Sequence, residues 1–211
     1  MGETGLCGTN QGSLQFMNDI HSVAIYCASS TKVKPIYYET ARELGRLLAE
    51  RGVTQVNGAG NMGLMQAASD AALKAGGKVV GVIPKFMIEQ DWHHTGLTQL
   101  IETEDMESRK RTINDMTDAA IVLPGGCGTL DELFEIMTLK QLGVYLKPIV
   151  ILNIEGYYDY LLQHLQRSME ENFMRREHGD IWKVATTAQE AVDLVFTTPL
   201  IEESVRRFAK I

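Results

Sequence analysis

The sequence predicts an α/β fold, a single-domain, doubly wound (Rossmann-like) parallel sheet with helices on both faces. Short apolar runs alternate with longer segments in which apolar residues recur at helical spacing. Glycine-bearing turns separate the two kinds of segment. The chain has 211 residues, 45% of them hydrophobic, which is enough for one sizeable core. Strands joined by helices of this length form right-handed crossovers and therefore a parallel sheet.

The first two strand and helix units are the clearest. Residues 22–29 form a short apolar run bounded by polar residues. Apolar side chains then recur at helical spacing and stop at Gly52. The unit repeats in residues 54–77, where Gly76 and Gly77 are placed to end the second helix.

The same alternation continues to the end of the chain. Residues 85–96 are the longest irregular stretch and predict a lid or an interface loop. After the second unit we expect strands at 78–84, 99–105, 119–124, 147–153 and 181–187, and helices at 106–118, 129–142, 157–172, 188–196 and 201–210.

Composition limits the partners. The formal charge of −7 and the lack of a Lys/Arg run disfavour nucleic acid and an anionic membrane surface. The three cysteines have neither CxxC nor metal-ligand spacing, which predicts free thiols, a reducing cytoplasmic compartment and no metal site. No window approaches the roughly 18 apolar residues of a membrane span. Residues 1–20 lack signal-peptide features and predict a mobile tail before one domain at residues 21–211.

Residues 121–132, "IVLPGGCGTLDE", predict a phosphate site. Gly125, Gly126 and Gly128 lie between an apolar strand and a helix, so backbone N–H groups can point into one small volume. The helix N-terminus also favours negative charge. Thr129 has a hydroxyl at the helix start that can cap the helix, bind the anion, or both.

Two carboxylates follow this loop. Glu132 lies one turn into the expected helix, beside whatever the phosphate carries. A carboxylate beside a phosphate is costly unless a cation or a developing positive charge uses it. Alternatively, Asp131 and Glu132 only complement the helix dipole. The residues alone leave both interpretations open.

A second glycine loop, residues 58–63, matches GxGxxG after a strand and before a helix. A dinucleotide site also needs an acidic residue about 20 positions later to hold the ribose. Residues 78–84 contain no carboxylate. We therefore interpret this loop as a second wall of a mononucleotide site, and not as part of a nicotinamide oxidoreductase.

Several motifs together resemble one family. Residues 124–132 resemble the PGGxGTxxE motif of the LOG family, the cytokinin riboside 5′-monophosphate phosphoribohydrolases, many of which were once labelled lysine decarboxylases. "YCASS" at 26–30 is similar to the family's CGSS, "NGAGNMGLM" at 57–65 to GGGxxGLM, and "MESRK" at 106–110 to MHERK. The resemblance covers nearly all of residues 23–195.

This resemblance implies hydrolysis of the N-glycosidic bond of a purine nucleoside 5′-monophosphate, with release of the free base and ribose 5-phosphate. It implies no metal or organic cofactor, and a homodimer or higher homo-oligomer, for which the apolar helix at 61–77 is a candidate contact. Arg109 and Glu132 take the catalytic positions. The implied substrate-binding residues are Ser29, Ser30, Gly58, Gly60, Asn61, Met62, Lys110, Gly125, Gly126, Gly128 and Thr129.

The sequence departs from the family pattern near the base pocket. Ala28, Ala59 and Gln66 replace glycines, and Glu107 and Ser108 stand where the family has His-Glu. AMP or another purine nucleotide is therefore at least as strong a candidate substrate as a cytokinin nucleotide.

The chemistry fits the two catalytic positions. Glycosidic cleavage builds positive charge on the sugar, which a carboxylate stabilises in the transition state. We expect the permanently charged Arg109 to hold Glu132 ionised. The alternative is a non-catalytic nucleotide or molybdenum-cofactor carrier of similar fold, which has no need of this pair. A decarboxylase would need a lysine poised for a Schiff base.

Overall fold

The computed structural model describes residues 18–200. Most of the expected tail and the whole expected helix at 201–210 lie outside these residues. The packed chain begins before the predicted boundary at residue 21, because the Asn18 side chain donates hydrogen bonds to the carbonyls of Val195 and Thr198 at 3.0 and 2.7 Å, and Ile20 is buried.

Within the described chain, seven parallel strands form one sheet in the order β4-β3-β2-β1-β5-β6-β7. This confirms the predicted α/β class. The direction of winding changes between β1 and β5, so the switch point lies in the middle of the sheet. The strands are β1 (Ser22–Tyr26), β2 (Thr54–Asn57), β3 (Val79–Pro84), β4 (Gln99–Thr103), β5 (Ala119–Val122), β6 (Ile149–Leu152) and β7 (Lys183–Ala185).

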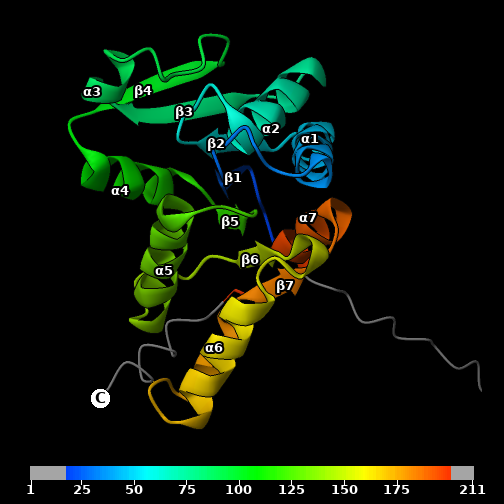
Figure 1. The fold of residues 1–211 in the computed structure, drawn as a ribbon, viewed down its shortest axis with the longest axis vertical. Helices are drawn as coiled ribbons and strands as arrows, with labels where there is room; N and C mark the ends of the chain where they lie inside the picture. The colour runs from blue at the N-terminus through cyan, green and yellow to red at the C-terminus, as the bar shows by residue number, and fades with distance from the viewer. Residues whose placement is uncertain (1–17, 201–211) are drawn as a thin grey trace, which may run out of the picture.

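Helices cover both faces of the sheet (Figure 1). Alternate residues of each strand point to opposite faces, so the Val23 and Ile25 side chains enter one core, and those of Ala24 and Tyr26 enter the other. The first core packs against α1 (Pro35–Glu50), α2 (Gly63–Lys74) and α7 (Ala188–Thr197); the second packs against α4 (Met106–Met116), α5 (Cys127–Gln141) and α6 (Asp159–Glu170).

Glycines end two helices where the sequence predicts it. Gly52 (φ 71°) follows α1 and Gly76 (φ 79°) follows α2, both in the left-handed region that favours glycine. Three short helical turns were not predicted, because they are too short to show a helical period: α3 (Lys85–Ile88), η1 (Ile154–Gly156) and η2 (Arg176–Asp180).

The helix α2 packs against its own domain. A Cβ atom on Gly45 of α1 would overlap the Ala68 carbonyl oxygen of α2, so the two backbones meet without a side chain between them. The apolar residues of α2, among them Leu64 and Met65, are buried in the first core. The apolar stripe expected as an oligomer contact is therefore used within the chain. Between residues 18 and 200, no helix has both the length and the hydropathy to cross a bilayer.

Candidate active site

A cavity of about 400 Å³ opens beyond the carboxyl ends of β1, β2 and β5, beside the switch point of the sheet. This is where ligands bind in open parallel sheets. Most of the predicted site residues line it: Ser29, Ser30, Gly58, Gly60, Arg109, Gly126, Gly128, Thr129 and Glu132. Cys27, Ala28, Met65, Met87, Met106 and Asp131 complete the lining. The lining does not include Asn61, Met62, Lys110 or Gly125.

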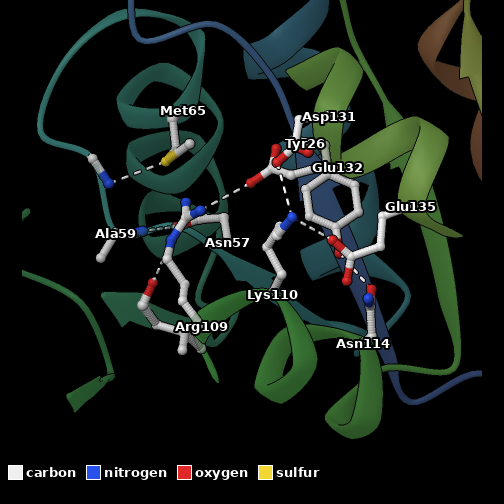
Figure 2. A network of polar contacts seen from close by, with 12 residues as sticks. Tyr26, Asn57, Ala59, Met65, Arg109, Lys110, Asn114, Asp131, Glu132 and Glu135 are labelled. Atoms are coloured by element: carbon white, nitrogen blue, oxygen red, sulfur yellow. Dashed lines mark hydrogen bonds and ion pairs between the residues drawn. The ribbon is translucent and has the colours of Figure 1, made fainter. Parts of the chain in front are cut away.

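Arg109 and Glu132 form a buried ion pair at this cavity (Figure 2). Nη1 of Arg109 on α4 donates to Oε1 of Glu132 on α5 at 3.0 Å. The two residues are only 6% and 8% exposed. Nε of Arg109 also donates to the Val82 carbonyl of β3 at 3.1 Å, which fixes the plane of the guanidinium. The two predicted catalytic residues are therefore in direct contact.

Gly58 provides the space for this guanidinium. A Cβ atom at Gly58 would overlap Nη2 of Arg109. Any side chain at this position would force the guanidinium to leave either Glu132 or the Val82 carbonyl. The position of Arg109 therefore explains why residue 58 is glycine, without any contact to a ligand.

The glycines around the start of α5 are of two kinds. Gly126 and Gly128 face open space, because a Cβ atom on either would meet nothing within 4 Å. Gly125 instead lies against Thr129, where a Cβ atom would overlap the threonine Oγ1. The Tyr157 hydroxyl donates to the Gly125 carbonyl at 2.7 Å and holds the loop in place.

The first turn of α5 has backbone N–H groups that are not used within the helix. The helix begins at Cys127, two residues before the predicted start, and Gly126 is its N-cap without a side-chain hydrogen bond. The alternative that Thr129 caps the helix is therefore wrong, because Thr129 is already inside the first turn and buried beneath Gly125. The N–H groups of the first turn have no partner within the helix, so they are available to an anion.

Asn61 and Met62 of the second glycine loop do not line the cavity, whereas Gly58 and Gly60 do. The Asn61 side chain donates to the Asp91 carbonyl at 2.8 Å, and its N–H donates to the Trp92 carbonyl at 3.2 Å. The Met62 side chain is 48% exposed on the outside. The segment expected as a lid or interface loop contributes Met87 to the wall of the cavity.

Lys110 lies beside the ion pair but is not among the residues that line the cavity. Its Nζ is 3.0 Å from Oδ2 of Asp131 and 2.5 Å from Oε2 of Glu135, both on α5 (Figure 2). Its side chain is 17% exposed. Within residues 18–200, no group of three His, Cys, Asp or Glu side chains is placed to hold a metal ion.

Comparison with known proteins assigns the chain to a family. Residues 65–195 match the family described as possible lysine decarboxylase. The cytokinin riboside 5′-monophosphate phosphoribohydrolase LOG7 of Arabidopsis thaliana is 38% identical over 170 residues, covering 81% of this chain and 78% of that protein. The probable phosphoribohydrolase LOGL2 of Oryza sativa subsp. japonica is 38% identical over 171 residues, covering 81% and 70%.

The chain belongs to the LOG family. Among solved structures, the molybdenum cofactor binding protein of Rippkaea orientalis matches with a TM-score of 0.64 at 22% identity, covering 82% of this chain and 94% of that one. At that identity the likeness shows the shared fold alone.

Burial changes the protonation of the LOG glutamate. Removal from water raises the pKa of Glu132 to about 7, although Arg109 opposes the shift. Desolvation outweighs the opposing effect of Arg109 on the pKa of this carboxyl, although Arg109 favours the ionised form as the sequence predicts. Burial also raises the pKa of the neighbouring Cys27, which stays a neutral thiol.

The sequence did not predict that three methionines, Met65, Met87 and Met106, line the cavity. Met65 is buried and has the helical spacing of a core residue, so nothing in the sequence indicates that it also lines a cavity. Met106 begins the segment that resembles the family's MHERK, which was the available signal. Cys27 and Cys127 are free thiols, as expected.

Proposed function

We propose that this protein hydrolyses the N-glycosidic bond of a purine nucleoside 5′-monophosphate and releases the free base and ribose 5-phosphate. The observation that carries the proposal is the buried Arg109–Glu132 pair, which lies in the same cavity as the open N-terminus of α5. The names of the relatives, cytokinin riboside 5′-monophosphate phosphoribohydrolases, support the same reaction.

The phosphate binds at the start of α5. Backbone N–H groups of the first turn and the helix dipole favour an anion there, and Gly126 and Gly128 leave the space that it fills. The Ser29 and Ser30 hydroxyls, which follow β1, lie in the same cavity and donate further hydrogen bonds. A phosphate held in this way places the ribose next to Glu132.

Glu132 acts on the sugar. Breaking the bond to the base develops positive charge on the ribose ring, and an ionised carboxylate in a dry site stabilises that charge more than it stabilises the ground state. The same carboxylate can accept a proton from the attacking water. Its raised pKa, about 7, suits a base that works near neutral pH.

Arg109 has two tasks. Its hydrogen bond orients the Glu132 carboxylate, and its charge favours ionisation of Glu132 against the effect of burial. No metal or organic cofactor takes part in the proposed reaction, so activity should survive chelation by EDTA.

The base lies against the methionines. Met65, Met87 and Met106 give the cavity a soft apolar surface that can contact the flat faces of a purine. Both AMP and cytokinin riboside monophosphates remain candidate substrates, because an apolar methionine surface does not select one exocyclic substituent of the purine.

The experiment is to incubate pure protein with AMP, an N6-alkylated AMP and adenosine, and to measure the free base by chromatography. We expect the nucleotides to be cleaved far better than the nucleoside, because the phosphate positions the sugar. Equal kcat/KM for AMP and adenosine would remove the phosphate site from the proposal. Tight binding without turnover of any nucleotide would favour the carrier.

We further propose that the protein works as a homodimer or higher homo-oligomer in a reducing cytoplasm. Large apolar side chains, Val144, Tyr160 and Phe173, are 69 to 84% exposed, which is typical of contact surfaces. The free thiols Cys27 and Cys127 suit a reducing compartment. Analytical ultracentrifugation tests the assembly, and fractionation of cells tests the compartment.

A further inference from the structure

Three cross-helix ion pairs lie side by side between α4 and α5. Arg109 pairs with Glu132 at 3.0 Å, and the next residue, Lys110, pairs with Asp131 at 3.0 Å and Glu135 at 2.5 Å (Figure 2). Successive residues of a helix point about 100° apart, so the two cations need not both reach the cavity. Arg109 lines it and Lys110 does not.

Lys110 balances a local excess of negative charge. Three carboxylates of α5, Asp131, Glu132 and Glu135, face two cations of α4. Asp131 is adjacent to Glu132 in the chain and also lines the cavity. Without Lys110, the charge of Asp131 would act on the buried glutamate with no counter-ion beside it.

From this geometry we infer that Lys110 is a positioning residue that acts on Glu132 through Asp131 and Glu135, and is not a contact for the substrate. The inference rests on the proposed function, because the glutamate whose charge Lys110 sets is the proposed catalytic one. It also replaces the role of substrate contact that the motif implied for Lys110.

The groups around Glu132 define the direction of the effect. From α4, Arg109 and Lys110 lower its pKa; from α5, Asp131 raises it, and burial raises it most. The remaining titratable neighbours are Tyr26 and Cys27 at the end of β1, both of which are neutral because burial raises their pKa values. Removal of the Lys110 charge therefore raises the pKa of Glu132 further.

The test is the pH dependence of kcat/KM for AMP in Lys110→Met. We expect the midpoint of the acid limb to move up by about half a pH unit, with a loss of about twofold at pH 7 and little loss at high pH. Lys110→Arg keeps the charge and should retain the wild-type profile. In the double variant Lys110→Met, Asp131→Asn, the midpoint should return toward the wild-type value.

Lys74→Met is the matched control. Lys74 is exposed at the far end of α2, so this variant loses the same charge without touching the pair and should keep the wild-type midpoint. A KM that rises equally at every pH in Lys110→Met, with an unmoved acid limb, would show a substrate contact and overturn the inference. A lower melting temperature with unmoved pH dependence would overturn it as well.

A second readout separates this inference from the proposed function. The side-chain carboxyl of Glu132 can be titrated by carbon-13 NMR, with its resonance assigned by its loss in Glu132→Gln. If the wild type cleaves no nucleotide, the proposed function fails, but the titration still decides the role of Lys110. An unchanged Glu132 midpoint in Lys110→Met would then refute it.

Discussion

At the scale of single residues, Glu132 is held in an environment that opposes its charge. It is 8% exposed, and its pKa is raised to about 7 by burial despite a 3.0 Å ion pair with Arg109. Such an arrangement costs stability and is typical of a functional carboxylate rather than of a residue that complements a helix dipole.

The substitution Glu132→Gln tests that role. The amide keeps the shape of the side chain but loses the charge that the transition state needs, so we expect kcat to fall on the order of 10²-fold or more. Affinity for AMP, measured by calorimetry, should stay within a few-fold of wild type. An active Glu132→Gln enzyme would restore the dipole interpretation, which requires an effect of about 1 kcal/mol or less on stability.

Gly58→Ala tests the position of Arg109. The new methyl group would overlap the guanidinium, which must then leave either Glu132 or the Val82 carbonyl. We expect kcat/KM to fall by about 10²-fold and the unfolding free energy to fall by about 1 to 3 kcal/mol. Gly179→Ala is the control, because its methyl group would meet only the flexible Met169 side chain at 3.2 Å. Wild-type kinetics in Gly58→Ala would show that the pair is not needed.

Residue by residue, the sequence identified the buried ion pair at the cavity but not every neighbour. Arg109 and Glu132 followed from the family motif, and the position of Glu132 beside a phosphate loop had its own physical argument. Lys110 shares the motif with Arg109 but lies on another face of α4, which only the helix geometry reveals. Asn61 does not line the cavity, because it bonds to the carbonyls of Asp91 and Trp92 in a distant loop, and its contact with substrate stays a prediction.

At the scale of elements, the strand–loop–helix unit from β5 to α5 contains one glycine that faces the proposed phosphate site and one that packs inside the fold. Gly126 faces open space with φ −91°, a conformation open to any residue, whereas Gly125 lies against the buried Thr129. Neighbouring glycines of one motif therefore have different functions.

Gly126→Ala and Gly125→Ala should consequently differ. In Gly126→Ala the methyl group enters the proposed phosphate site, so we expect KM for AMP to rise about tenfold while the melting temperature stays within about 2 °C of wild type. In Gly125→Ala the methyl group overlaps Thr129 and should lower the unfolding free energy by about 1 to 3 kcal/mol. Thermal melts and steady-state kinetics on both variants measure this. The opposite pattern would exchange the roles of the two glycines.

The elements themselves were largely predictable. Strand and helix periods differ enough that each of the seven strands was anticipated, and Gly52 and Gly76 marked helix ends. The start of α5 was placed two residues late, because its N-cap is a glycine that offers no side-chain signal. The packing of α2 against α1 was also missed, since it depends on Gly45 lying opposite Ala68.

At the scale of the whole molecule, activity and stability should respond to pH in opposite directions. The folded pKa of Glu132, about 7, lies above its ordinary value of 4.5. The folded state therefore binds the proton more tightly, and this stabilisation is complete below pH 4.5 and is lost as the pH rises through 7. The carboxylate needed for catalysis forms over the same range.

We expect kcat/KM for AMP to rise with pH to a plateau, with a midpoint near 7. Relative to Glu132→Gln, the wild type should lose up to about 3 kcal/mol of unfolding free energy between pH 4.5 and pH 8. Urea unfolding of both proteins at several pH values measures the difference in unfolding free energy. Subtracting the value of the variant removes the contributions of the other titrating groups. A constant difference across this range would show that Glu132 is ionised throughout.

The backbone at Ala59 links two positions that are distant in sequence. Ala59 has φ 59°, where glycine is usual, and its methyl carbon lies 2.6 Å from the point that a Cβ atom on Gly81 would occupy. A Cβ atom on Gly81 would also overlap Cδ1 of Leu97. In evolutionary terms the three positions are linked: we expect a relative with a side chain at the position of Gly81 to have glycine at the position of Ala59 and a smaller residue at the position of Leu97.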